Sequence, residues 1–196
     1  TEAFIKDIKS AFKEDIRIRV EPPENHSEEG LKTKSFEIQQ GLIFEKDQLS
    51  VTAFDVDHGG GVKHAFGYKI KYKNRSVVIS GDTNYSSNLV SYAKNSDLLI
   101  HEIADAPLSI INKYPKVEGL MNYHTTPEEM ARVINEAKPR YTVLTHMLLL
   151  GGISETDVLD KVKNLTNNKA EVELAYDLMA IDVKDNIRTY SIDYEK

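Results

Sequence analysis

Side chains able to bind a metal ion or to carry a proton recur in the second half of this sequence. Asp82 follows an apolar run, and the adjacent His101 and Glu102 follow another. His124 lies just before a Thr-Thr-Pro step, and His146 follows a further apolar run. Carboxylates and imidazoles are zinc ligands, and both can act as general acids or bases. The spacing therefore indicates metal binding combined with proton transfer.

Each of these residues, taken alone, also fits an ordinary structural role. Asp82 fits a turn or helix-cap aspartate, and His124 and His146 fit loop, edge or core histidines. Their succession at the ends of elements favours one shared site, because α/β scaffolds gather functional residues there. Side chains alternate along a strand, so one of His101 and Glu102 is expected to face the core and the other the cleft.

The elements expected to position these residues are strands alternating with helices. Apolar runs predict strands at 41–45, 49–56, 66–73, 76–80, 97–101, 141–145, 172–176, 178–183 and 187–192. Short helices are expected at 88–94, from a capping box at Thr126 to Pro139, and from a second cap at Ser154 to Leu165. The pattern predicts the α/β class.

The chain is expected to form a single domain over residues 1–196. Phe4, Ile8, Phe12 and Ile16 repeat every four residues, which predicts a helix within residues 1–20. A polar, proline-containing connection covers 21–35, and the sheet and helix body covers 36–196.

Composition narrows the classes of function. The chain has 196 residues, 40% of them hydrophobic, which is enough for one substantial core. The formal net charge of -6 does not favour nucleic acid as a partner, although a local basic patch would permit it. There is no cysteine, so any metal must be held by His, Asp and Glu. No apolar run approaches the roughly 18 residues that cross a bilayer, so no membrane partner is expected.

Four segments together resemble the metallo-β-lactamase superfamily. They are Val77–Thr83, Asp97–Glu102, His124–Pro127 and Leu144–His146. More narrowly they resemble the branch that holds ribonuclease Z and the arylsulfatase-like zinc hydrolases, over about residues 51–183. The segments Phe54–Gly59 and Phe66–Tyr68 look closer to the arylsulfatase-like group. The resemblance implies an αββα sandwich, of which this chain holds the C-terminal part.

The resemblance also implies a role for each residue. Asp82 matches a carboxylate that bridges two zinc ions, and His146 matches a histidine ligand of the second zinc. Glu102 and His124 match a catalytic pair near the leaving group, in which Glu102 orients His124. In such enzymes a hydroxide bound by the two zinc ions attacks the ester. A sulfate ester or a phosphodiester, as a small anionic substrate, is the expected class.

Two departures from the ribonuclease Z pattern bear on the substrate. The chain reads His101-Glu102-Ile103-Ala104 where that enzyme continues with Ala-Thr, and Thr125 stands where it has Ser. A tRNA 3′-end processing endonuclease is therefore an alternative to the small anionic ester.

The superfamily's His-x-His-x-Asp-His block has no match in this chain. The one Asp-His step is Asp57-His58, and Ala53 and Asp55 stand where that block needs histidines. His58 is a loop histidine beside glycines, and His64 and His26 are expected at the surface. We therefore expect the chain to be the C-terminal portion of a longer hydrolase, since zinc needs about four ligands.

The alternative is a catalytically incomplete half-domain that acts as a binding or structural module. Pairing with an N-terminal portion, or a homodimer, would then complete the fold. The sequence does not determine the cellular compartment. The protein would be cytoplasmic, or periplasmic or secreted if a signal peptide lies upstream of residue 1.

Overall fold

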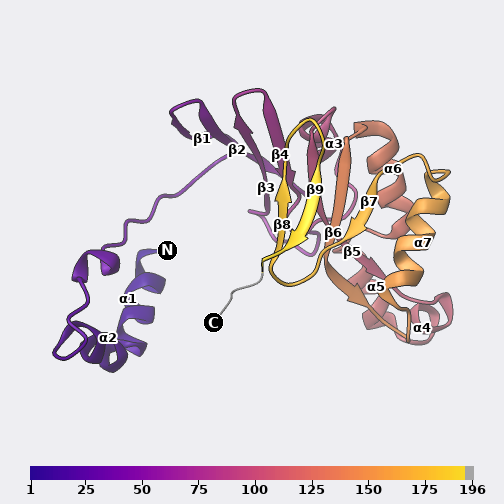
Figure 1. The fold of residues 1–196 in the computed structure, drawn as a ribbon. Coiled ribbons are helices and arrows are strands. Elements are labelled where there is room, and N and C mark those ends of the chain that lie inside the picture. The colour runs from indigo at the N-terminus through magenta and orange to yellow at the C-terminus, as the bar shows by residue number, and fades with distance from the viewer. Residues whose placement is uncertain (193–196) are drawn as a thin grey trace. The chain divides into compact units, whose positions relative to one another are not determined.

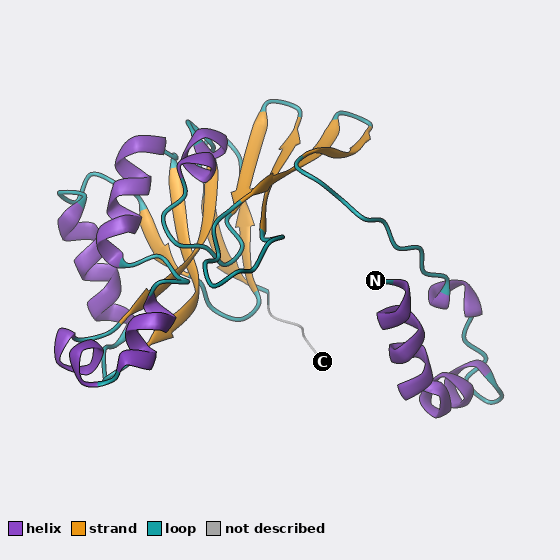
Figure 2. Cartoon of the chain, turned by 180° about the vertical axis from the view of Figure 1, so that it is seen from behind, coloured by secondary structure: helices purple, strands orange, loops and turns teal. Residues whose placement is uncertain are grey.

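A computed structural model describes residues 1–192 of the chain. The chain divides into two compact units, one spanning Thr1–Gln39 and the other beginning at Gln40. The ribbon views draw the helices and strands of each unit (Figures 1 and 2), and each unit is described by itself. The single domain predicted for residues 1–196 stays a prediction.

The first unit is helical. Helices α1 (Glu2–Ala11) and α2 (Lys13–Val20) are followed by the short 3-10 helix η1 (Glu28–Leu31). The single helix predicted within residues 1–20 is wrong in one respect, because the structure has two helices there. Phe12 has φ −97° and ψ 14°, which ends α1 and starts α2. Neither helix buries a residue, and Phe4 and Phe12 are exposed.

The second unit is built on a seven-stranded sheet in which the strands follow their sequence order. The strands are β1 (Gly41–Lys46), β2 (Leu49–Asp55), β3 (Phe66–Tyr72), β4 (Arg75–Ile79), β5 (Leu98–Asp105), β6 (Tyr141–Leu149) and β7 (Val172–Leu174). Strands β1 to β4 are antiparallel, and β4 to β7 are parallel. The parallel half brings the carboxyl ends of β4, β5 and β6 to one edge, where ligands bind in open α/β sheets.

Three helices cover one face of this sheet (Figures 1 and 2): α3 (Ser87–Ala93), α6 (Pro127–Ala137) and α7 (Glu155–Leu165). Both predicted capping boxes are present, at Thr126 and at Ser154. Two helices that the sequence reading missed connect β5 to this layer, namely α4 (Leu108–Lys113) and α5 (Pro115–Met121). Both have fewer than two full turns of pattern, so periodicity carried little signal.

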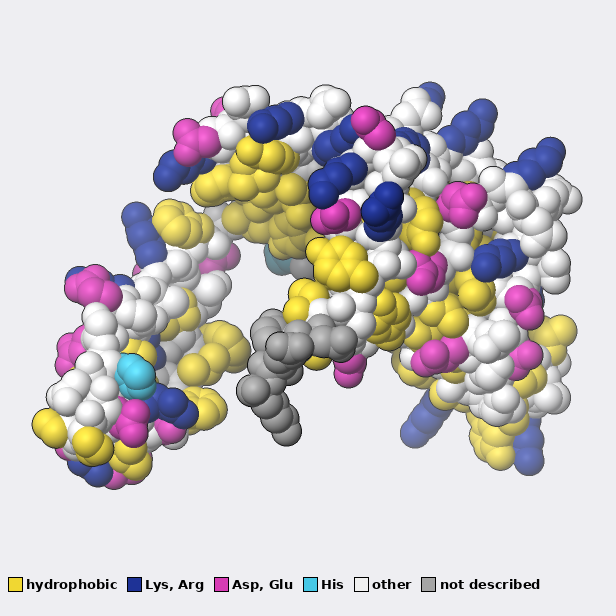
Figure 3. Space-filling view, viewed as in Figure 1, with side chains coloured by type: hydrophobic (Ala, Val, Ile, Leu, Met, Phe, Trp, Pro, Cys, Tyr) yellow, Lys and Arg dark blue, Asp and Glu magenta, His cyan; other side chains and the backbone are white. Residues whose placement is uncertain are grey.

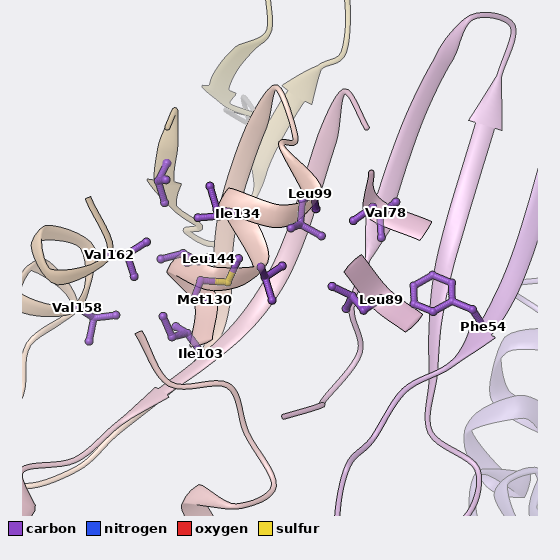
Figure 4. Close-up of a cluster of buried hydrophobic side chains, with 14 residues drawn as sticks. Phe54, Val78, Leu89, Leu99, Ile103, Met130, Ile134, Leu144, Val158 and Val162 are labelled. Atoms are coloured by element: carbon purple, nitrogen blue, oxygen red, sulfur yellow. The ribbon is translucent and has the colours of Figure 1, made fainter. Parts of the chain in front are cut away.

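The main core lies between the sheet and these helices (Figure 4). Leu99 and Ile103 of β5 and Leu144 of β6 meet Met130 of α6 and Val158 of α7, all with no exposed surface. Burying side chains of this size stabilises the fold by roughly 1.5–3 kcal/mol each. The core therefore fixes β5 and β6, the two strands that carry Glu102 and His146.

The opposite face of the sheet is less covered. Its residues Val51, Ile70 and Val77 lie side by side on β2, β3 and β4 and are half-buried. Phe44 of β1, which pairs with Val51, is 46% exposed. Figure 3 shows hydrophobic side chains gathered over β1 and β2, bordered by Lys and Arg. A second sheet of two antiparallel strands, β8 (Met179–Asp182) and β9 (Arg188–Ser191), lies on this side in Figure 1.

These layers confirm the predicted α/β class. Among residues 1–192, none of the helices combines the length and the apolar character that a bilayer-crossing segment needs.

Candidate active site

Asp82 lies in the turn that follows β4. Gly81 makes this turn with φ +65°, and a Cβ on it would come within 2.5 Å of the Phe66 carbonyl oxygen. A side chain there would be strained and would clash with backbone, so glycine is required. The tight turn leaves the Asp82 side chain 41% exposed.

His146 lies in a β-bulge of β6. In the pairing of β5 with β6, Glu102 lies opposite Thr145 and Ile103 opposite Met147, so His146 is the extra residue. Its φ is +45°, in the left-handed region that non-glycine residues rarely adopt. A bulge turns a side chain away from the strand's alternation. The predicted strand 141–145 is thus too short, because β6 continues past the bulge to Leu149.

Glu102 and His101 lie in the middle of β5, not at its end as the sequence predicted. The strand continues to Asp105 because β6 remains paired beside it. Both side chains are buried, at 2% and 1% exposure. Glu102 faces the site, while His101 turns away and its Nδ1 lies 2.6 Å from the Glu102 carbonyl oxygen. The two side chains thus have different surroundings, and the role of Glu102 in a site stays a prediction.

His124 lies in the loop between α5 and α6, two residues before the Thr126 cap. Its Nδ1 is 3.1 Å from Glu102 Oε2, and the Thr125 amide donates to Glu102 Oε1 at 2.7 Å. One carboxylate thus holds both the ring and the backbone of this loop. The Ala104 amide completes the attachment by donating to the Thr125 carbonyl at 2.9 Å.

Three of the four residues meet closely enough to share an ion. One ligand atom from each of Asp82, His124 and His146 lies within 4.8 Å of the others. His146 Nε2 is 3.3 Å from Asp82 Oδ2, and the rings of His124 and His146 are 6.0 Å apart at their centroids. Glu102 contacts His124, so all four predicted site residues lie together at one edge of the sheet.

His58, the loop histidine beside glycines, also lies against this cluster, although it is not among the predicted site residues. Its ring centroid is 5.4 Å from that of His124, and its Nδ1 is 3.0 Å from the Tyr123 carbonyl oxygen. A carbonyl accepts only from N–H, so Nδ1 carries the proton and Nε2 keeps its lone pair. Its loop packs tightly, since a Cβ on Gly60 would come within 2.6 Å of the Tyr123 ring. The sequence signal was the glycine run beside a lone histidine, in a loop next to a strand.

The buried pair has shifted proton affinities. Burial raises the pKa of Glu102 to about 8, against which hydrogen bonds from Thr125 and Thr83 act. Burial also lowers the pKa of His124, to which the neighbouring His58 and His146 add while Asp82 opposes. Both directions favour an uncharged pair at neutral pH. In an uncharged pair, the Glu102 carboxyl group donates its proton to Nδ1 of His124. The proton of the neutral imidazole ring then lies on Nε2.

The donor set fits a metal ion of borderline character. It consists of a carboxylate and imidazoles with no thiolate, which is a set that zinc and iron accept in proteins. His58, beside this set, donates to a backbone carbonyl as metal-bound histidines commonly do. Asp82 and His146 are the residues that would hold an ion, with His58 beside them.

The match to a family of known proteins agrees with this geometry. Residues 11–147, more than half of the chain, match the family described as the beta-lactamase superfamily domain. The chain belongs to the metallo-β-lactamase superfamily. Asp82, Glu102, His124 and His146 all lie within the matched residues.

Relatives within this superfamily include ribonuclease Z enzymes. Ribonuclease Z of Bacillus subtilis (strain 168) is 28% identical over 161 residues, covering 57% of this chain and 50% of that enzyme. Ribonuclease Z of Myxococcus xanthus (strain DK1622) is 35% identical over 113 residues, covering 56% and 33%. The chain spans about half the length of the first of these.

Solved structures share the metallo-β-lactamase fold. The metallo-β-lactamase fold protein YhfI from Bacillus subtilis has a TM-score of 0.52 at 21% identity, covering 67% of this chain and 48% of YhfI. CmlA, a diiron β-hydroxylase from Streptomyces venezuelae, has a TM-score of 0.53 at 12% identity, covering 82% and 35%. These likenesses show the fold alone.

Proposed function

We propose that this chain carries part of the active site of a metal-dependent hydrolase that cleaves phosphodiesters. The observation that carries the proposal is the meeting of Asp82, His124 and His146 within 4.8 Å, with Glu102 bonded to His124. Residues able to bind an ion thus lie next to a pair able to transfer a proton. Metal-ion catalysis and general acid catalysis can each accelerate the hydrolysis of an anionic ester.

Asp82 and His146 are proposed as metal ligands. Their side chains are 41% and 60% exposed and face each other at 3.3 Å, so both can turn toward an ion. A divalent ion held here would lower the pKa of water and polarise the ester oxygen. Zinc is the proposed ion, and His58 is proposed as a further ligand because its Nε2 lone pair is free of the Tyr123 contact.

His124 is proposed as the proton donor to the leaving group, although its ring also lies within reach of an ion. In the uncharged pair with Glu102, its Nε2 carries a proton and so has no lone pair for a metal. Glu102 holds the ring in this orientation and keeps the second nitrogen directed at the site. Removal of the proton from Nε2 is balanced by transfer from the Glu102 carboxyl group to Nδ1.

The substrate class is proposed from the relatives. Ribonuclease Z enzymes are similar to this chain over more than half of its length, which favours a phosphodiester in RNA over a sulfate ester. The net charge of -6 opposes this preference, because RNA binding requires clustered Lys and Arg. A small phosphodiester and a tRNA 3′ end are therefore the two substrates to compare. The arylsulfatase-like likeness stays a prediction.

A second candidate function is a binding or structural module without catalysis of its own. The observation that favours it is the ligand count, since the grouping within residues 1–192 offers three close ligand atoms. A two-metal site needs more ligands than these. Two tightly bound metal ions per purified chain would reject this second candidate, and pairing with another chain would favour it.

The deciding experiment compares three substrates with the purified protein and added Zn²⁺. The substrates are bis(p-nitrophenyl) phosphate, p-nitrophenyl sulfate and a tRNA with a 3′ extension. We expect phosphodiester cleavage that is lost in His146→Ala and kept in His64→Ala, a matched change at an exposed histidine outside the cluster. Cleavage of the sulfate alone, or turnover that persists in His146→Ala, would contradict the proposal.

A further inference from the structure

Thr83 lies where three loops of the candidate site meet. It has no exposed surface, although it directly follows Asp82 in a turn at the edge of the sheet. Buried hydroxyl groups are costly unless they are hydrogen-bonded. The contacts of Thr83 therefore show what this side chain holds together.

The hydroxyl group of Thr83 joins its own turn to the loop that carries His58. Its Oγ1 accepts from the Asp57 amide at 3.1 Å. Its single proton has two backbone carbonyl oxygens within reach, those of Asp57 at 3.1 Å and Asn84 at 2.8 Å. The Asn84 amide donates to the Asp57 carbonyl at 2.8 Å, so the two segments are bonded at several points.

The backbone of Thr83 joins the same turn to the loop that carries His124. Its carbonyl oxygen accepts from Thr125 Oγ1 at 2.7 Å, and Thr125 is also fully buried. Its amide lies close enough to Glu102 to stabilise the ionised carboxylate. One residue thus contacts the segments of His58, Asp82, Glu102 and His124.

We propose that Thr83 is a positioning residue that sets the spacing of the metal-binding side chains. This inference rests on the proposed function, because it assigns the spacing to ion binding. The required group is the hydroxyl, since valine has nearly the same shape but cannot accept from the Asp57 amide. That amide would then lose its protein partner, and the contact that fixes the loop of His58 against the Asp82 turn would be broken.

If Thr83 only stabilised the fold, replacing it would weaken Zn²⁺ binding no more than replacing another buried threonine. A buried threonine elsewhere, Thr166 at the end of α7, also donates from Oγ1 to backbone carbonyls, of Val162 and Lys163, both at 3.0 Å. It is 3% exposed and contacts none of the site loops. Thr166→Val is therefore the matched control, since it removes the same kind of bond with no path to the site.

The test measures the affinity for Zn²⁺ by competition with a chromophoric chelator. We expect Thr83→Val to weaken binding by about 10- to 100-fold, the range typical of residues that orient ligands. Thr83→Ser keeps the hydroxyl and should stay within about 3-fold of the wild type, as should Thr166→Val. If Thr83→Val does not fold, Thr125→Val replaces it, with the same expected weakening.

A second readout needs no metal. Amide hydrogen exchange in the metal-free chain should become faster at Asp57 and Asn84 in Thr83→Val and stay unchanged in Thr166→Val. Unchanged Zn²⁺ affinity in Thr83→Val, or equal weakening in Thr166→Val, would overturn the inference. If the wild type binds no Zn²⁺, the proposed function fails, and exchange alone then decides: unaltered rates at Asp57 and Asn84 overturn the role of Thr83.

Discussion

The candidate site has a buried side and an exposed side that differ in how they are built. On the buried side, Glu102 and His124 are 2% and 7% exposed and are held by hydrogen bonds to each other and to Thr125. On the exposed side, the side chains of Asp82 and His146 are 41% and 60% exposed, and they form an ion pair with each other at 3.3 Å.

The two sides reach their geometry by different means. The buried side rests on β5 and on the capped start of α6, so its side chains are fixed when the core forms. The exposed side rests on a glycine turn and on a bulge in which His146 has φ +45°. Strained positions of this kind persist where they place a functional group. This difference fits the proposed roles, in which the rigid side transfers the proton and the exposed side binds the ion.

Removing the proton donor should have the largest effect on catalysis. We expect His124→Ala to lower kcat for the phosphodiester by roughly 10²–10⁴-fold, the usual contribution of a general acid. Bound Zn²⁺ should change little, because the proposed ligands Asp82 and His146 are untouched. Steady-state kinetics with metal analysis of the same sample provides the measurement.

The matched change on this side is Glu102→Gln, which keeps the shape of the side chain and removes its acid. It should lower kcat in the same direction and leave the metal content unchanged. A loss of metal in either variant would assign His124 to the ion and would erase the distinction between the two sides.

Burial should also make the fold sensitive to acid. The pKa of His101 is lowered from 6.5 to about 4 by burial, opposed by its bond to Glu102. The unfolded chain therefore binds a proton that the folded chain excludes, so stability is full above pH 6.5 and is lost as the pH falls to 4. The loss is on the order of 3 kcal/mol. Urea unfolding of the metal-free chain between pH 4 and pH 7 measures it.

The control for the acid effect is His101→Gln, which keeps a donor near the Glu102 carbonyl and does not titrate. Its stability should depend less steeply on pH over this window. An identical slope in the variant and the wild type would show that other groups cause the acid sensitivity.

The smallest expected effect tests whether the helix cap also supports the buried side. Thr126→Ala removes the cap of α6 and should lower the free energy of unfolding by about 1 kcal/mol. Ser154→Ala removes the corresponding cap of α7 and should cost a similar amount. We expect kcat to stay within about 3-fold in both, because Glu102 holds the His124 loop without the cap. A selective loss of kcat in Thr126→Ala would place the cap within the machinery of the site.

The sequence predicted best those features that depend on neighbouring residues. The capping boxes at Thr126 and Ser154 were predicted because their signal lies within four residues. The strand at β4 and the turn at Asp82 follow from an apolar run that ends at glycine. The order of the site residues along the chain was sufficient to expect them at one edge of a parallel sheet.

Features that depend on pairing between distant strands were not predictable in the same way. The bulge at His146 exists because β5 and β6 stay paired beyond Glu102, which no local pattern in β6 reveals. The approach of His58 depends on contacts to Tyr123 and Thr83, 65 and 26 residues away from the His58 loop. The helices α4 and α5 were too short for periodicity to indicate them.

The most direct test of the division between the two sides is the affinity for Zn²⁺ of His146→Ala and His124→Ala, measured side by side in the metal-free protein. We predict that His146→Ala weakens binding by at least about 10-fold and that His124→Ala stays within about 3-fold of the wild type. Unchanged binding in His146→Ala, or equal weakening in both variants, would contradict the assignment of ion binding to the exposed side.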